Sequence, residues 1–263
     1  MKTLVLGEKV AQHRGRKPEA LYPIARGPLF TPMHGYDCWR AYELTWCDAS
    51  GKPAIGILEL AYPLASSCII ESKSLKLYLG GLADERFGSS DELLATIRQD
   101  LTEALNSPWI ELRLYRPAEF EQLRGAVELS NIDELEPPAY ASEPEPGLLK
   151  TLAGAALSET LTSNLLRTFC PITAQPDWGT LTVSYRGAPI DKGSLLGYVL
   201  SYREHQGFAE SCCESIYKDI WQKCRPEWLK VVCHYTRRGG IDITPVRCSE
   251  PVGFERQERL IRQ

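Results

Sequence analysis

The chain has 263 residues, of which 43% are hydrophobic and 24% are charged, with a formal net charge of −4. This composition is typical of a globular protein that can bury a core in one or two domains. A negative net charge gives no electrostatic basis for binding nucleic acid, so we expect no such partner. The apolar runs are too short to span a bilayer, and residues 1–8 lack the apolar stretch of a signal peptide. We therefore expect a cytoplasmic protein with no membrane partner.

The nine cysteines and four histidines do not form a metal-binding pattern. There is no Cys-x-x-Cys and no histidine pair at ligand spacing, so we predict no metal site. An odd number of thiols without an export signal is typical of reduced cysteines in a cytoplasm. Most of them, such as Cys47, Cys68 and Cys233, lie in apolar runs and are predicted to be inert core residues.

The first half of the chain predicts strands, then helices, then strands. Residues 39–47 and 54–62 look like two strands joined by the turn-rich segment 48–53. Ser90 then opens a helix whose apolar residues recur every 3.6 positions up to residue 105. After a stop at 106–108, residues 110–115 alternate like a half-buried strand.

The second half repeats this order. Alternation predicts a strand over 180–185, helical stripes cover 195–202 and 212–224, and strand patterns follow at 229–235 and 241–243. A polar, proline-rich segment at 136–147 separates the halves. We therefore predict an α+β protein with domains at residues 1–147 and 148–263.

Residues 71–79 are ambiguous. They alternate like a strand, yet Leu75 and Leu79 also fit one face of a helix, and periodicity cannot decide between these for nine residues. The repeat favours a helix, because this segment occupies the position that 195–202 fills in the second half.

One segment, residues 169–179, combines a thiol and a carboxylate in a constrained stretch. It reads Phe-Cys-Pro-Ile-Thr-Ala-Gln-Pro-Asp-Trp-Gly, so two prolines separate Cys170 from Asp177 and predict a shaped loop that leads into a strand. A cysteine thiolate can attack an electrophile, and an acid beside it can protonate the product of that attack. Alternatively, Cys170 is a buried inert thiol and Asp177 a turn or capping residue.

Two glutamates and a glycine turn are further candidates. Glu71 and Glu210 stand at predicted helix starts, where a carboxylate can complement the helix dipole or accept two N–H donors of a heterocyclic base. Arg237-Arg238-Gly239-Gly240 is either a surface turn or a phosphate-binding one, because arginine forks match phosphate geometry. No Gly-x-Gly-x-x-Gly follows a strand, so a Rossmann site is not predicted.

Four segments in this order, namely 71–79, 170–179, 201–205 and 235–242, resemble the long, two-module form of the NADPH-dependent 7-cyano-7-deazaguanine reductases, the QueF family. The resemblance runs from about residue 36 to the end, whereas the first 35 residues match poorly. It implies tandem tunnelling-fold (T-fold) modules, each an antiparallel sheet backed by helices, that assemble as a homodimer. The first module would carry the Glu-Ser-Lys motif and the second the cysteine and the aspartate.

The resemblance also implies a reaction. The cysteine adds to the nitrile of 7-cyano-7-deazaguanine as a covalent thioimide, and two hydrides from NADPH reduce this to the aminomethyl product, a queuosine precursor. Cys170 would be the nucleophile and Asp177 the proton donor, which requires burial or a partner that keeps Asp177 protonated. The implied substrate-binding residues are Ile70, Glu71, Ser72, Ala209 and Glu210, and the implied NADPH-binding residues are Ser72, Lys73, Arg238 and Gly239.

Ala209 departs from the family pattern, in which Phe-His-Glu stands at 208–210. Alanine cannot assist proton transfer, so the chain is an engineered variant, a natural member with water in place of the imidazole, or a protein that binds ligand and turns over poorly. Two other functions stay open: a deazapurine-binding homologue with impaired reduction, and a relative that attacks the same nitrile but transfers an amidine. Lys73, Arg238 and Gly239 argue against the transferase, which has no use for a dinucleotide.

Overall fold

The computed structural model describes residues 15–123, 130–139, 141–260 and 262–263. Within these ranges no helix is long and apolar enough to cross a membrane. The segment 1–8, for which we expected no signal peptide, lies outside the described residues.

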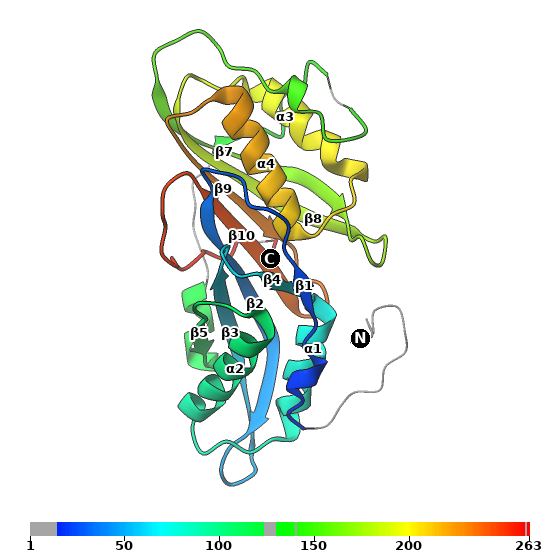
Figure 1. The fold of residues 1–263 in the computed structure, drawn as a ribbon, viewed down its shortest axis with the longest axis vertical. Helices are drawn as coiled ribbons and strands as arrows, with labels where there is room; N and C mark the ends of the chain where they lie inside the picture. The colour runs from blue at the N-terminus through cyan, green and yellow to red at the C-terminus, as the bar shows by residue number, and fades with distance from the viewer. Residues whose placement is uncertain (1–14, 124–129, 140, 261) are drawn as a thin grey trace.

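One eight-stranded sheet runs through both halves of the chain (Figure 1). Neighbouring strands are antiparallel except β6 and β7, which are parallel. A small second sheet pairs β1 (Pro23–Ala25) with β4 (Cys68–Ile70). The order in the large sheet is β5 (Glu111–Tyr115), β3 (Pro53–Pro63), β2 (His34–Cys47), β10 (Ile241–Cys248), β9 (Trp228–Tyr235), β8 (Pro176–Gly187), β7 (Leu157–Phe169) and β6 (Ser130–Asn131).

Four α-helices of the described residues cover one face of this sheet (Figure 1). They are α1 (Ser72–Gly81), α2 (Ser90–Leu105), α3 (Lys192–Leu200) and α4 (Ala209–Cys224), with short 3₁₀ segments at Pro18–Ala20, Leu82–Asp84, Pro117–Leu123, Pro146–Leu148 and Ser201–Glu204. The mixed, mainly antiparallel architecture confirms the α+β prediction. The domain boundary at 147/148 stays a prediction.

Each half buries its own apolar cluster between helices and sheet. Leu75 of α1 and Ile97 of α2 pack with Leu58 and Leu60 of β3 in the first half. In the second half, side chains of α3 and α4 pack on β8 and β9. At about 25 cal/mol per Å² of buried apolar surface, such clusters are the main favourable contribution to folding.

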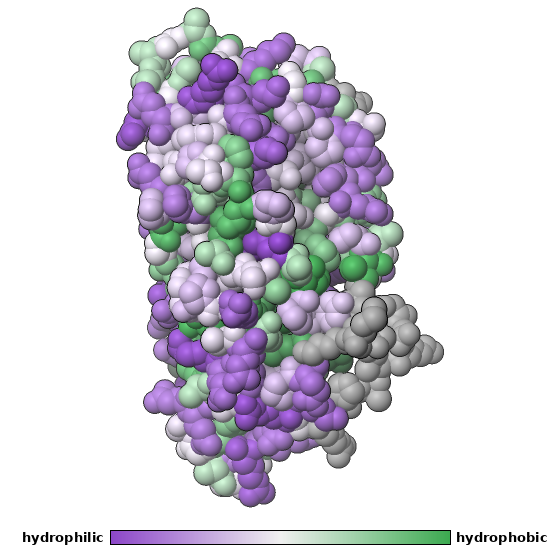
Figure 2. Space-filling model, viewed as in Figure 1, coloured by the Kyte–Doolittle hydropathy of each residue, from purple (hydrophilic) through white to green (hydrophobic). Residues whose placement is uncertain are grey.

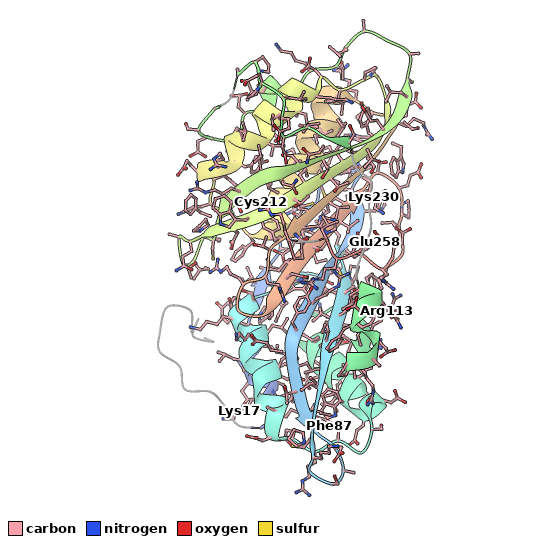
Figure 3. The ribbon with its side chains drawn as sticks, turned by 180° about the vertical axis from the view of Figure 1, so that it is seen from behind. Lys17, Phe87, Arg113, Cys212, Lys230 and Glu258 are labelled. Atoms are coloured by element: carbon pink, nitrogen blue, oxygen red, sulfur yellow. The ribbon has the colours of Figure 1, made fainter. Side chains whose placement is uncertain are left out.

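The opposite face of the sheet is covered in part by the segment after β10. Figure 3 labels Lys230 of β9 and Glu258 of this segment close together on that face. Lys230 forms an ion pair with Glu255 at 2.9 Å, and the Gln263 side chain donates to the His234 carbonyl. Arg40, paired with Glu59 at 2.9 Å, also donates to the Gln257 carbonyl. The end of the chain therefore helps to fix β2 and β9.

The structure resolves the ambiguous segment and corrects two details. Residues 72–81 are a helix, as the repeat indicated. Strand β7 was not predicted, because a register shift between Ser163 and Leu166 interrupts its alternation. Asp133 stabilises this irregularity by accepting hydrogen bonds from the Ser163 hydroxyl and the Asn164 amide. We expected more than one strand of the first half after its helices, and for the described residues this prediction is wrong. Only β5 follows α2 and pairs within the first half, because β6 pairs with β7 of the second half.

A buried ionic network joins the two halves beside α4. Arg247 of β10 pairs with Asp37 of β2 at 2.7 Å, and both side chains are 0% exposed. Arg26, which follows β1, pairs with Asp37 at 2.5 Å and with Glu214 of α4 at 2.7 Å. Burial alone would lower the pKa of Arg247, but the charge of Asp37 raises this pKa above its usual value. Burial likewise opposes the ionised form of Asp37, but the two arginines keep its pKa below the usual value.

We predict that Asp37→Asn destabilises the protein by about 3–5 kcal/mol, because it leaves two buried guanidinium groups with one counter-ion. Urea unfolding measures this change. The control is Glu227→Gln, which breaks the pair with Arg186 whose side chains are 55% and 59% exposed, and which should cost less than about 1 kcal/mol. Equal effects of the two substitutions would contradict the stabilising role of the network.

Candidate active site

A pocket lies where the two halves meet. It offers about 700 Å³ of space, part of it open to solvent, and much of its lining comes from the start of α1, the β7–β8 loop, the start of α4 and the β9–β10 turn. In Figure 1 the first turns of α1 and α4 and the β7–β8 hairpin approach one another at mid-height. Figure 2 shows apolar surface in the same middle region, whereas the lower end of this face is mainly hydrophilic. Trp39, Ile241 and Ile243 from the paired strands β2 and β10 form apolar walls.

Cys170 is held in a closed loop at the end of β7. Its amide donates to the Gln175 carbonyl at 2.9 Å, and its carbonyl accepts from the Ala174 amide at 2.9 Å. Ala174 adopts a left-handed φ of 51°, which lets the loop close before β8 begins at Pro176. The Phe169 amide and carbonyl bond to His205 and Gly207 in the connection before α4. These bonds fix the half-buried thiol at the pocket, as the sequence predicted for a shaped loop.

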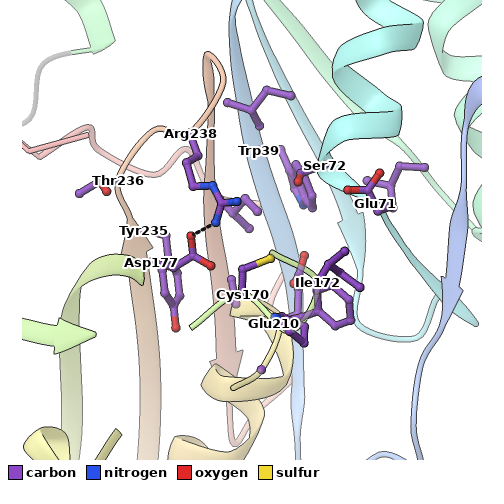
Figure 4. A pocket seen from close by; sticks show the side chains of 17 residues that line it. Trp39, Glu71, Ser72, Cys170, Ile172, Asp177, Glu210, Tyr235, Thr236 and Arg238 are labelled. Carbon is purple, nitrogen blue, oxygen red and sulfur yellow. Dashed lines mark hydrogen bonds and ion pairs between the residues drawn. The ribbon is translucent and has the colours of Figure 1, made fainter. Parts of the chain in front are cut away.

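Asp177 faces the same pocket from β8 but is ion-paired (Figure 4). Its Oδ1 lies 2.7 Å from Nη1 of Arg238, and Nη2 of Arg238 donates to the Thr173 hydroxyl at 2.9 Å. Burial lowers the pKa of Arg238, but Asp177 and then Cys170 raise it overall. The burial expected of Asp177 is not complete, because its side chain is 26% exposed and its ion-pair partner is the Arg238 cation.

Glu71 caps α1 and also lines the pocket. Its Oε1 accepts from the Lys73 amide at 2.9 Å and its Oε2 from the Ser74 amide at 2.7 Å. The structure confirms the helix-cap interpretation of Glu71. Its role in binding a base stays a prediction, which is compatible with a buried carboxylate whose remaining lone pairs can accept further N–H donors.

Glu210 is the most perturbed acid of the pocket. It lies in the first turn of α4, is 2% exposed, and its Oε1 has no hydrogen-bond partner among the described residues. Burial, and next the charge of Asp37, raise its pKa to about 8. The pocket therefore contains one ion-paired carboxylate and one carboxyl group that is protonated near neutral pH.

The structure brings most of the predicted site residues together. Lining the pocket are Cys170, Asp177, Arg238 and the predicted substrate-binding residues Ile70, Glu71, Ser72, Ala209 and Glu210. Gly239 lines a neighbouring groove, and Lys73 lies on the first turn of α1 without lining either space. Trp39, Phe208 and Tyr235 were missed. Tyr235 adjoins the Arg-Arg-Gly-Gly motif, but nothing in the local pattern of β2 distinguishes Trp39 from a core residue.

The basic residues and the glycine turn in and beside the pocket suit a phosphorylated dinucleotide such as NADPH. Arg238 is 42% exposed there, and α1 adds the cations Lys73 and Lys76. Gly239 and Gly240 adopt φ values of 59° and 79°, a turn that glycine forms without strain and that exposes its backbone. Guanidinium, ammonium and exposed backbone groups are the donors that phosphates require.

Two family models match the chain. The model described as the N-terminal part of the nitrile reductase 7-cyano-7-deazaguanine reductase matches residues 17–112, and the model described as QueF-like protein matches residues 176–252. Two curated relatives are both named NADPH-dependent 7-cyano-7-deazaguanine reductase. That of Paraburkholderia phymatum is 44% identical, with 92% of each chain covered, and that of Desulfotalea psychrophila is 41% identical, covering 98% of this chain and 96% of the relative.

A solved structure of the archaeosine synthase QueF-Like covers 39% of this chain at 20% identity, and its TM-score of 0.33 is too low to support an argument. The matched ranges and the identity to the curated relatives define the class of protein. The chain belongs to the QueF family of nitrile reductases.

We predict that the pH dependence of stability reports the proton on Glu210. The pKa is raised from 4.5 to about 8 on folding, so the folded state holds this proton more tightly. The resulting stabilisation is complete below about pH 4.5 and is lost as the pH rises to about 8. Glu210→Gln cannot lose a proton. The unfolding free energy of this variant minus that of the wild type should therefore increase by on the order of 3–5 kcal/mol from pH 5 to pH 9. Parallel stability curves from urea titrations would rule out a protonated Glu210.

Proposed function

We propose that this chain reduces the nitrile of 7-cyano-7-deazaguanine to an aminomethyl group with NADPH, in queuosine biosynthesis. The observation that carries the proposal is one pocket in which Cys170, Asp177, Glu71 and Glu210 converge from both halves of the chain. The names of the relatives and the matching family models support the same reaction. In the overall reaction, one nitrile, two NADPH and two protons give one amine and two NADP⁺.

The base lies between the first turns of α1 and α4. The Glu71 carboxylate accepts N–H groups of the deazaguanine, because carboxylate oxygens take two such donors side by side. The protonated Glu210 accepts one N–H at its carbonyl oxygen and can donate its own proton to the base. Ile70, Ser72 and Ala209 line the same space, and the apolar walls exclude water around the ring. This arrangement directs the nitrile toward the thiol.

Cys170 attacks the nitrile carbon. The C≡N bond becomes C=N as the new C–S bond forms, and the thiol proton is transferred to the nitrogen. Asp177 carries this proton: its carboxylate accepts it from the thiol and then donates it to the nitrogen. Arg238 pairs with Asp177, and it also interacts with Cys170. Its positive charge therefore stabilises negative charge on the Asp177 carboxylate or on the Cys170 thiolate. The product is the covalent thioimide.

Ser72, Lys73, Arg238 and Gly239 would hold NADPH, which when bound would supply the two hydrides. The C–S bond breaks after the thioimide carbon is reduced, and its electron pair returns to the Cys170 sulfur, so the amine leaves without a bond to the protein. The pocket retains the partly reduced ligand between the two steps, because Glu71 and Glu210 continue to bind the base.

The finer fold and the assembly are part of the proposal. The repeat of two long strands followed by two helices, β2, β3, α1 and α2 in one half and β7, β8, α3 and α4 in the other, supports tandem T-fold modules. Among the described residues β5 has a strand on one side only, and this open edge supports pairing in a homodimer. All nine cysteines are unpaired, which supports a reducing cytoplasm. The negative net charge supports a reaction without a nucleic-acid partner.

We predict that the protein mixed with 7-cyano-7-deazaguanine, without NADPH, gains the mass of one whole ligand, because thiol addition to a nitrile releases no leaving group. Intact-protein mass spectrometry detects the adduct. It should be absent in Cys170→Ala and retained in Cys47→Ala, a matched control because Cys47 is also half-buried. Adding NADPH should discharge the adduct. No adduct on the wild type, or one that persists in Cys170→Ala, would exclude the proposed nucleophile.

We also predict that Ala209→His increases the rate of NADPH oxidation by about 10-fold or more, because an imidazole in the pocket lining can relay protons. Ala209→Asn is the control for a polar side chain that does not titrate. Steady-state absorbance measures the rate, and an equal change in both variants would show that proton relay at this position does not limit turnover.

A further inference from the structure

Trp39 of β2 lines the active-site pocket with an unpaired hydrogen-bond donor. Its side chain is 1% exposed, and its indole Nε1 has no hydrogen-bond partner among the described residues. An indole N–H can only donate, and buried polar groups in proteins are nearly always paired. The N–H of Trp39 is therefore a group that a bound ligand can satisfy.

An apolar wall alone does not require this donor. The other wall residues from the paired strand β10 are Ile241 and Ile243, whose side chains have no polar atoms, and Ile243 lies directly opposite Trp39 in the sheet. A phenylalanine at position 39 would supply a flat ring without burying an unpaired N–H, which is unfavourable in the free protein. A ligand that accepts from the indole is bound more tightly than one that cannot.

Trp39 lies on the Glu71 side of the pocket. It belongs to the same core cluster as Ile70 and Leu75, which stand on either side of the cap of α1 in the sequence. Figure 4 shows Trp39 next to Ser72 and on the same side of the site as Glu71. The indole N–H and the Glu71 carboxylate can therefore meet the same edge of a bound ring.

Other donors of the lining already have partners. Both terminal nitrogens of Arg238 are engaged, one with Asp177 and one with the Thr173 hydroxyl. The Tyr235 hydroxyl interacts with Thr168 and Cys212, neither of which lines the pocket. The Trp39 indole, by contrast, keeps its donor for a ligand.

The base itself needs such a donor. Along one edge of a deazaguanine, a carbonyl oxygen, a ring N–H and an amino group follow one another. A carboxylate can accept the ring N–H and the amino group side by side, but it repels the carbonyl oxygen next to them. A neutral N–H beside that carboxylate matches the carbonyl oxygen.

We propose that the Trp39 indole N–H donates a hydrogen bond to the carbonyl oxygen of the deazaguanine, which makes Trp39 a residue that determines base specificity. The inference rests on the proposed function and deepens it, because it assigns the part of the base that the Glu71 carboxylate cannot bind. A base with an amino group in place of the carbonyl, as in adenine, would set one donor against another and would be rejected.

The test compares Trp39→Phe with Trp46→Phe. Trp46 is a matched control, because it is a buried tryptophan of the same strand and core cluster that does not line the pocket. The ligands are 7-cyano-7-deazaguanine and its thio analogue, in which a sulfur, a weaker acceptor, replaces the carbonyl oxygen. We expect Trp39→Phe to lower kcat/KM about 10-fold or more for the oxo ligand and less than about 3-fold for the thio analogue.

Trp46→Phe should leave the ratio of the two ligands as in the wild type. Equal losses for both ligands in Trp39→Phe would show that the indole only packs against the base, and no loss for either would equally overturn the inference.

A magnetic resonance measurement on the wild type is independent of turnover and of any effect of a substitution on folding. In protein with isotope-labelled tryptophan, the Trp39 indole N–H signal is the one missing from Trp39→Phe. It should move downfield when 7-cyano-7-deazaguanine binds, and less with the thio analogue, which has the same rings and therefore controls for their magnetic effect. Equal shifts with the two ligands would contradict the hydrogen bond.

The Cys170 adduct separates the two proposals. If the adduct forms equally fast in the wild type and in Trp39→Phe with both ligands, the assignment of Trp39 fails and the proposed function stands. If the wild type forms no adduct, the proposed function fails. The indole signal with 7-deazaguanine, which has no nitrile, then decides whether Trp39 binds the base: a downfield shift supports the contact and an unchanged signal overturns it.

Discussion

The pairing of β2 with β10 is the interaction on which the site depends. Residues 34–41 of the first half pair with 241–248 of the second, from Ile241 opposite Ala41 to Cys248 opposite His34. This register joins two separately packed cores into one sheet and sets Trp39 opposite Ile243 as adjoining walls of the pocket. A shift of one residue would turn these side chains to the other face of the sheet. Neither half contains the site alone, because α1 supplies Glu71 whereas α4 and the β7–β8 loop supply Glu210 and Cys170.

Two charge arrangements give the acids of the pocket different environments. Asp177 faces Arg238 across an ion pair that is partly exposed. Glu210 lies behind it in a dry setting near Asp37, and its raised pKa keeps a proton on it at neutral pH. The arginines that neutralise Asp37 also limit this effect. Acids whose environments differ in this way are typical of active sites, where one group must donate or accept and another must bind.

The sequence predicted the parts of the site that local chemistry determines. Two prolines indicated the loop of Cys170, and a carboxylate before an apolar helix stripe indicated the cap at Glu71. The resemblance to the reductases added the roles of Asp177 and Arg238. Their ion pair was not predicted, because it joins residues 61 positions apart through the order of strands β8, β9 and β10.

Long-range packing also explains the remaining misses. The irregularity at Ser163 hides β7 from a search for alternation, and it is stabilised by Asp133 from outside the strand. The raised pKa of Glu210 depends first on its burial and then on the charge of Asp37 in β2, and neither can be predicted from the local sequence around Glu210. Lys76 looks like any exposed lysine until the β9–β10 turn is placed against α1.

The most direct test of the account is a crystal structure of the protein soaked with 7-cyano-7-deazaguanine and no cofactor. The account predicts continuous electron density from Cys170 Sγ to the former nitrile carbon, with the pyrimidine ring between the carboxyl groups of Glu71 and Glu210. A ligand bound elsewhere, or one in this pocket with its nitrile directed away from the sulfur, would contradict it.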